Sequence, residues 1–176
     1  MTSIGSVAIS IAEDKDDEAI GRFLSRIPMD GAVRISFERR PSFLKAAMRG
    51  NREVQVVVAR DHATGEIVGL GSRAVRRAFI NGEPADIGYL ANLRLSEKRR
   101  RSVFLSRGYQ FLHDLHSDGR VKAYYSTVLE DNREALAVLT SRRAGLPSAR
   151  PTRRSSSGVD RSSPSDTSST RPAAAG

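Results

Sequence analysis

The amino-acid sequence predicts an α/β (α+β) fold, in which a mixed, mostly antiparallel and twisted sheet is flanked by helices. Two features of the 176-residue chain support this prediction. Alternating and β-branched runs joined by short turn signals indicate neighbouring antiparallel strands. Stretches with apolar residues at helical spacing lie before and after these runs, and the later stretch is followed by a further strand pattern.

The chain begins with one predicted strand and two predicted helices. Residues 7–11 read as a short strand. The acidic residues within 13–18 suit the positive end of a helix dipole, and the apolar residues of 20–27 have helical spacing. Residues 28–41 are irregular. A second, short helix is predicted over 42–50, because a proline and a serine precede it and a glycine ends it.

Three antiparallel strands should follow. Residues 54–60 are apolar and β-branched enough for a buried central strand, and a turn at 61–66 leads into a second strand at 67–79. The pair Asn81-Gly82 is a strong short hairpin signal, and it joins the second strand to a third strand at 87–95.

The C-terminal part adds a strand between two helices. After the basic segment 98–102, the apolar side chains of 104–115 share one helical face and should pack on the sheet. The alternating segment 121–129 should return parallel to the preceding strand by a right-handed crossover, because a helix separates the two. Residues 130–132 cap a last helix that is predicted to end near 145–147.

Composition sets the domain organisation and excludes several classes of function. We expect one domain over 1–147 and a disordered tail over 148–176, which has almost nothing apolar to bury. The formal charge of +9 favours an anionic ligand, nucleic acid or an acidic surface. The absence of cysteine excludes disulfides and thiolate chemistry, and His113 and His116 lack a third ligand type, so no metal is expected. Without a signal peptide or a long apolar run, we expect a cytoplasmic protein and no membrane partner.

The order of strand, basic loop and helix at 87–116 is suited to holding a diphosphate. The first turn of a helix has unpaired backbone N–H groups and the positive end of the dipole, so a polyanion is stabilised there. The successive arginines at 99–101 add charge-assisted hydrogen bonds to phosphate oxygens.

The element order over roughly 7–147 resembles the GCN5-related N-acetyltransferase (GNAT) superfamily. The acyl-CoA motif of that family, Arg/Gln-x-x-Gly-x-Gly/Ala, has its best local match at 99–104, where Ser102 and Phe104 replace the small residues. The segment Asn132-Arg133-Glu134-Ala135 looks like the Asn-x-x-Ala segment of the family's last conserved helix.

The resemblance has two further consequences. Many members of the family have a general-acid tyrosine seven residues after the asparagine, and that position here is Leu139. The family also completes its sheet with two more strands, for which 148–176 shows no pattern. We therefore expect a fold that lacks the last strands, in a truncated or frame-altered version of a longer parent.

The activity implied by the resemblance is direct transfer of the acetyl group of acetyl-CoA to a primary amine. The parallel strands at 87–95 and 121–129 would splay apart, and the pantetheine arm would pair with the backbone of one of them as an added strand does. The cofactor-binding residues implied are Leu93, Arg94, Leu95, Arg99, Arg100, Arg101, Ser102, Val103 and Asn132, of which Asn132 also reads as a helix cap.

The attacking amine must be neutral, so a carboxylate, directly or through water, must accept its proton. Asp86 and Glu83, near the start of the 87–95 strand, and Glu130, after the 121–129 strand, are the candidates. Tyr89 and Tyr124 are candidate proton donors, and no spacing singles out one residue.

Two other functions stay open. A GNAT-like domain that has lost catalysis and binds CoA or a partner is favoured by Leu139, by the replaced glycines and by the absent strands. A nucleic-acid-binding protein would use the arginines and the tail, but only 6% of the residues are aromatic and no recognition motif is present. The sequence leaves the acceptor amine open, and a homodimer is compatible with it.

Overall fold

The computed structural model describes residues 2–4, 7–27, 41–97 and 104–140. Its elements, in chain order, are β1 (Thr2–Ile4), β2 (Val7–Ile11), η1 (Asp14–Asp16, a 3₁₀ turn), α1 (Asp17–Arg26), α2 (Phe43–Met48), β3 (Glu53–Asp61), β4 (Ile67–Ile80), β5 (Glu83–Leu95), α3 (Phe104–His116), β6 (Tyr124–Tyr125) and α4 (Arg133–Leu139).

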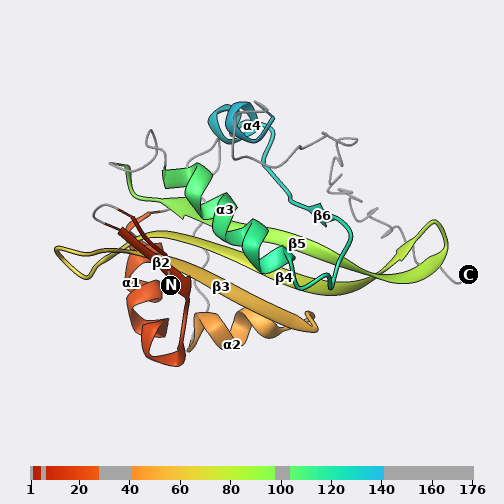
Figure 1. Ribbon diagram of the computed structural model, residues 1–176, viewed down its shortest axis with the longest axis horizontal. Coiled ribbons are helices and arrows are strands. Elements are labelled where there is room, and N and C mark those ends of the chain that lie inside the picture. Colours follow the sequence, from red (N-terminus) through yellow and green to blue (C-terminus); the bar gives the residue numbers. More distant parts are fainter. Residues whose placement is uncertain (1, 5–6, 28–40, 98–103, 141–176) are drawn as a thin grey trace, which may run out of the picture.

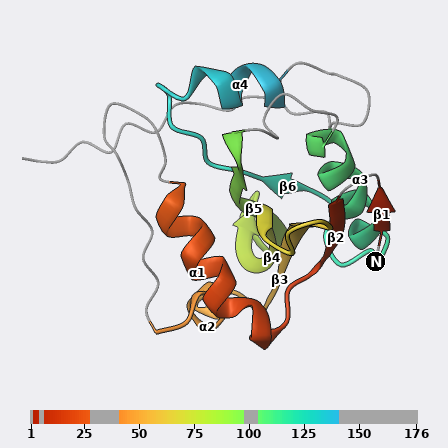
Figure 2. The ribbon, with the colours of Figure 1, turned by 90° about the vertical axis from the view of Figure 1, so that its left-hand side faces the viewer.

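The strands form one mixed sheet in the order β1-β2-β3-β4-β5-β6. Neighbours from β1 to β5 are antiparallel, and β6 pairs parallel to β5. Helices α1 and α2 cover one face of the sheet and α3 covers the other (Figures 1 and 2). The predicted fold class, with one parallel pair after an antiparallel run, is confirmed.

Each face of the sheet buries its own apolar cluster. On the first face, Ile20 and Phe23 of α1 and Phe43 of α2 pack against β3 and β4 through Val56, Val58, Ile67 and Leu70. On the other face, Val57 and the strand residues around it meet Phe111, Leu112 and Leu115 of α3. Because successive strand residues point to opposite faces, β3 contributes to both clusters.

The predicted hairpin turn is present where the sequence placed it. Asn81 and Gly82 have φ values of 53° and 86°, and the flanking residues Ile80 and Glu83 are paired. Two consecutive positive φ values match the right-handed twist of the flanking strands, and asparagine and glycine adopt them at low cost. The turn therefore sets the register of β4 and β5.

Besides shifts of one or two residues at other element ends, the structure differs from the sequence-based expectation at β1, β5, β6 and α4. The short edge strand β1 was not predicted, because three residues are too few to show periodicity. Strand β5 begins at Glu83 rather than at 87, since the turn pairs its flanking residues at once. Strand β6 contains only Tyr124–Tyr125 instead of 121–129, and α4 is described as far as Leu139.

The predicted 148–176 tail and the expected absence of further strands concern residues outside the described part of the chain, and both stay predictions. Within the described segments, no helix combines the length and the apolar character that crossing a membrane requires.

Candidate functional site

The site begins where β5 and β6 part. The two strands pair only at Gly88–Tyr124 and Tyr89–Tyr125, and the Gly88 N–H donates to the Ala123 carbonyl at 3.0 Å. Strand β5 continues to Leu95, whereas the chain leaves β6 after Tyr125 and runs to α4 (Figure 1). After Tyr89, the edge of β5 that faces β6 is therefore not paired with β6.

A β-bulge lies in this part of β5. Leu70 of β4 pairs with Arg94, but Ser72 pairs with Ala91, so β5 has an extra residue between these pairs. Asn92 has a φ of 57°, a left-handed conformation that asparagine tolerates better than most residues. Its side-chain amide donates to the hydroxyl of buried Ser72 at 2.9 Å, and that hydroxyl donates to the Ala91 carbonyl at 3.2 Å. Side chains thus hold the bulge in place.

The bulge determines which backbone groups of β5 face the edge that is not paired with β6. Before it, the backbone of Gly88 faces β6. After it, the Ser96 N–H donates to the Val68 carbonyl of β4, so alternation turns the backbone of Leu93 and Leu95 away from β4. In a regular strand these two residues would face β4. The Arg94 guanidinium donates to the Leu93 carbonyl at 2.8 Å, as expected for a carbonyl outside the ladder.

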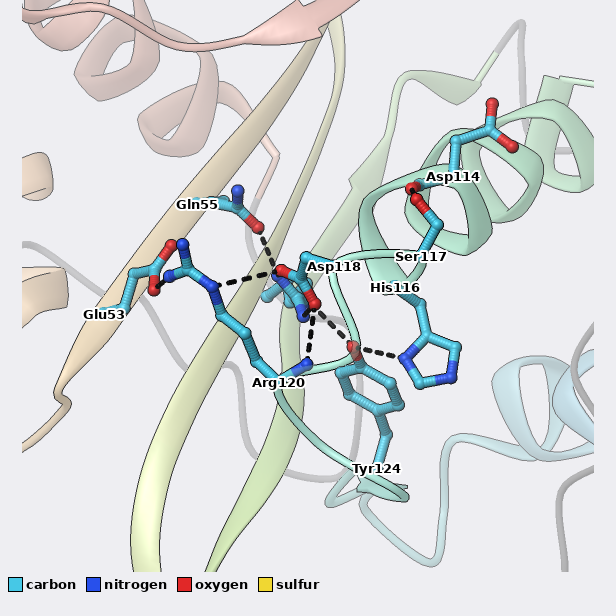
Figure 3. A network of polar contacts seen from close by, with 9 residues as sticks. Glu53, Gln55, Asp114, His116, Ser117, Asp118, Arg120 and Tyr124 are labelled. Carbon is cyan, nitrogen blue, oxygen red and sulfur yellow. Dashed lines mark hydrogen bonds and ion pairs between the residues drawn. The ribbon is translucent and has the colours of Figure 1, made fainter.

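A buried arginine anchors the junction on the α3 face. Arg73 of β4 is 1% exposed, and two of its nitrogens each donate to an Asp118 oxygen at 2.8 Å. The same guanidinium donates to Gln55 Oε1 and to the Tyr124 hydroxyl, both at 2.7 Å. Figure 3 shows these partners converging from β3, β6 and the loop after α3. One side chain therefore ties four segments together.

Tyr124 lies where β5 and β6 are still paired, at the start of the junction. A Cβ added to Gly88 would overlap the Tyr124 ring, so the ring lies directly over the glycine. The Tyr124 hydroxyl is 3.3 Å from Nδ1 of His116, the last residue of α3. The Tyr124 ring packs closely over Gly88, and the Tyr124 hydroxyl is held by its polar partners. Both contacts hold β6 at the point where its pairing ends.

The charges of this network perturb two ionisable groups. Burial alone would lower the pKa of Arg73, but the hydrogen bonds to Asp118 and Tyr124 outweigh it and raise that pKa. The Arg73 guanidinium holds the pKa of Asp118 below its usual range. In α3, burial raises the pKa of the Tyr109 phenol to about 12.

The carboxylates predicted as bases lie apart from one another. Both oxygens of Asp86 accept hydrogen bonds from Arg52, and Arg77 lies 3.8 Å from one of them. Asp86 lines an open pocket of about 350 Å³ with Arg52, Glu53, Val75 and Arg120, next to the start of β5. Glu83 is exposed at the hairpin turn, and Glu130 is exposed on the segment between β6 and α4. The structure brings none of these carboxylates together.

The two predicted tyrosines lie on opposite faces. The Tyr124 hydroxyl is engaged in the buried network, whereas Tyr89 faces the α1 and α2 side. There the Tyr89 ring stacks on Tyr125 with centroids 4.7 Å apart, and its hydroxyl is 3.0 Å from Thr127 Oγ1. Tyr89 thus bridges β5 to the departing segment at the point where the strands separate.

The remaining predicted residues fall into two groups. Asn132 Oδ1 accepts from the Ala135 N–H at 3.1 Å, as a helix cap does, and Leu139 ends α4 half-buried. The predicted phosphate-binding residues Arg99, Arg100, Arg101, Ser102 and Val103 lie outside the described residues.

Sequence reasoning missed Arg73, Ser72 and Asn92. A signal was present in each case, because each is a polar residue with apolar residues close to it in a strand pattern. Such residues need partners when they are buried, and the partner of Arg73 lies 45 residues away in sequence. Short-range spacing could not reveal that partner.

Comparison with solved structures identifies the fold. An aminoglycoside acetyltransferase from an uncultured soil metagenomic sample has 14% sequence identity and a TM-score of 0.61, with 85% of this chain and 93% of that chain covered. An acetyltransferase of Trypanosoma brucei has 14% identity and a TM-score of 0.59, with 85% and 99% covered. Glucosamine-6-phosphate N-acetyltransferase of Arabidopsis thaliana has 12% identity and a TM-score of 0.59, with 86% and 98% covered. No protein-family model matches the chain, and no curated protein matches its sequence.

These similarities confirm that the chain has the fold of GNAT acetyltransferases. The structural neighbours named above are acetyltransferases, and their likeness to this chain is one of fold. At 12–14% identity the likeness does not extend to a substrate.

Proposed function

We propose that the protein is an N-acetyltransferase that moves the acetyl group of acetyl-CoA to a primary amine. The observation that carries the proposal is the junction at which β5 and β6 part after two residue pairs, with a bulge that turns Leu93 and Leu95 outward. An extended amide chain can add to such an edge by backbone hydrogen bonds. The pantetheine arm of acetyl-CoA is a chain of this kind.

Several residues would hold the cofactor in this proposal. The backbone of Leu93 and Leu95 would pair with the pantetheine amides, which would replace the Arg94 guanidinium on the Leu93 carbonyl. The pyrophosphate would lie at Arg99–Arg101 and at the backbone N–H groups of Ser102 and Val103, close in sequence to the start of α3.

In the reaction, the neutral amine nitrogen attacks the thioester carbonyl carbon. A C–N bond forms, the C–S bond breaks, the amine gives up a proton and the CoA thiolate takes one. Leu139 provides no hydroxyl, so we assign proton donation to Tyr89, which lies where the strands separate. Asp86 is held by Arg52 on the far side of the junction, which favours Glu130 as the group that accepts the amine proton, directly or through water.

The bulge provides a direct test of cofactor binding. Substitution Asn92→Val places a β-branched residue at a φ of 57° and should regularise the strand, which would turn Leu93 and Leu95 back toward β4. Calorimetric titration should then show that acetyl-CoA binding weakens by about tenfold or more. Asn92→Gly, which keeps the positive φ, is the matched control and should retain most of the affinity. Equal acetyl-CoA affinity in the two variants would contradict the proposed cofactor site.

Release of free CoA in the presence of amines separates the enzyme from a binding module. Tyr89→Phe and Glu130→Gln should slow the release by about 10²-fold while acetyl-CoA affinity is unchanged. Tight acetyl-CoA binding without release for any amine would instead support the CoA-binding module, which the Leu139 position favours.

A further inference from the structure

A second arginine lies on the opposite face of the same junction. Arg76 of β4 faces the α1 and α2 side, and its guanidinium carbon lies 4.2 Å from the centroid of the Tyr89 ring. Its Nη1 donates to the Tyr125 hydroxyl at 3.1 Å, and its Nε donates to Asn51 Oδ1. We call Arg76, Tyr89, Tyr125 and Asn51 the Arg76 cluster.

The Arg76 cluster holds its cation in a fixed position. Asn51 is itself anchored, because its side-chain amide donates to the Ala47 carbonyl of α2 at 2.7 Å. The stacked rings of Tyr89 and Tyr125 fix the other side of the guanidinium. A guanidinium oriented in this way loses little conformational entropy when a ligand binds.

All described partners of this guanidinium are neutral. Among the residues that the structure describes, no carboxylate lies within ion-pair distance of Arg76. Asp86 is the β5 partner of Arg77, the residue after Arg76. It already accepts hydrogen bonds from Arg52 and lies 3.8 Å from Arg77. A half-buried cation with no anionic partner among the described residues favours a ligand that supplies one, and a planar guanidinium suits carboxylate and phosphate groups.

The cluster also lies beside the reacting centre proposed above. Tyr89 and Tyr125 form the last pair before β5 and β6 separate, and the Tyr89 hydroxyl contacts Thr127 on the departing segment. A ligand bound to Arg76 would therefore lie beside the point where the thioester is expected. We assign this position to the acceptor, because the cofactor phosphates are assigned to the other end of β5.

We propose, on the premise of the acetyl transfer above, that Arg76 recognises a carboxylate or phosphate on the acceptor, so that the protein selects anionic amines. Neutral amines of the same size would bind more weakly, and polycationic amines would be repelled by the fixed guanidinium. The proposal concerns specificity, and the amine itself stays free to attack the thioester.

Two matched pairs of amines test the proposal. O-Phosphoethanolamine against ethanolamine tests a phosphate, and glycine against glycinamide tests a carboxylate. Each amine is titrated calorimetrically into the full chain saturated with CoA, with spermidine as the polycation. At least one anionic member should bind about tenfold or more tighter than its neutral partner, and the stronger of the two anions identifies the group recognised.

Variants assign any preference to Arg76. Arg76→Gln should reduce the preference to about twofold or less, whereas Arg76→Lys, which keeps the charge without the planar fork, should retain part of it. The control is Arg77→Gln, because this neighbour points to the opposite face and its side chain is 59% exposed. It should leave the preference unchanged. Thermal unfolding of each variant confirms that it is folded.

The outcomes separate this proposal from the proposed function. Equal binding of the charged and neutral partners, no measurable amine binding, or a preference that survives in Arg76→Gln would each overturn the anion-binding role, even if acetyl-CoA is turned over. Loss of the preference in Arg76→Gln alone, together with failure to release CoA from acetyl-CoA, would support an anion site and reject the transferase.

Discussion

Arg73 and Arg76 lie three residues apart on β4, and each contacts one tyrosine of the Tyr124–Tyr125 pair. An odd separation along a strand places the two side chains on opposite faces of the sheet. Arg73 is buried and its guanidinium is neutralised by Asp118. Arg76 is only half-buried, and its described partners are a ring face, a phenol and an amide.

The difference shows that the partners of an arginine indicate its role better than its position does. A buried cation with a bidentate carboxylate has its charge satisfied within the fold, so it acts as a structural anchor. A cation held by neutral groups retains its net charge for a ligand. We therefore expect substitutions on the α3 face to change stability and substitutions on the other face to change binding.

The largest effect on stability should come from removing the anion on the α3 face. Asp118→Ala leaves the Arg73 charge buried without a counter-ion, which should lower the free energy of unfolding by about 3–5 kcal/mol. Urea unfolding measures this loss. Asp114→Ala in α3, whose carboxylate is 64% exposed, is the control and should change it by less than about 0.5 kcal/mol. Similar losses in both variants would show that Arg73 is not an anchor.

A smaller effect is expected from filling the space over Gly88. Gly88→Ala places a methyl group against the Tyr124 ring, so the ring must move, and overpacking of this kind costs about 1–3 kcal/mol. Chemical denaturation of Gly71→Ala provides the comparison, because open space surrounds that glycine of β4. If the ring contact is responsible, the cost of Gly88→Ala should shrink when Tyr124 is also changed to alanine. An undiminished cost in the double variant would assign the effect to the backbone.

Removing the hydroxyl of Tyr124 or of Tyr125 compares the two faces of the sheet by the loss of a single oxygen atom. Tyr124→Phe leaves the buried Nε–H of Arg73 without its acceptor and should lower the free energy of unfolding by about 1–2 kcal/mol. Tyr125→Phe removes an exposed hydroxyl and should change it by about 0.5 kcal/mol or less. Equal effects in denaturant titrations would remove the distinction between the faces.

The smallest and most specific effect is on the pH dependence of stability. Because the pKa of Asp118 is lowered in the folded state, its pairing with Arg73 stabilises the protein above the usual aspartate pKa. This contribution is lost as pH falls through the lowered value. Thermal unfolding between about pH 5 and pH 2 should therefore show a shallower acid decline in Asp118→Asn than in the unchanged chain. An identical decline in the two proteins would place the acid sensitivity elsewhere.

Local patterns in the sequence were sufficient for most of the fold. The residues of β2, the start of β4 and the Asn81-Gly82 turn lie where spacing and turn chemistry placed them. The apolar face of α3 was also readable, because Phe111, Leu112 and Leu115 pack against the sheet as their helical spacing predicts. These features depend on interactions between residues close in sequence.

The candidate site was only partly readable. The cofactor site predicted over 87–116 stays a prediction, although the backbone of Leu93 and Leu95 does face away from β4. The reason for that orientation, the bulge at Asn92, was not predicted, because a bulge is defined by the register of the partner strand. The predicted length of β6 was wrong for a similar reason. Alternation over 121–129 indicates a strand, but it does not indicate where pairing with the neighbouring strand ends.

By itself, the sequence determined the order of α-helices and strands from β2 onward and the antiparallel run with one parallel return, because periodicity and turn residues act over a few positions along the chain. Only the tertiary structure decided which cations are neutralised and which remain available. Arg73 meets Asp118 across 45 residues, whereas the described surroundings of Arg76 are neutral. Such pairings depend on which faces the sheet brings together, and spacing along the chain does not encode them.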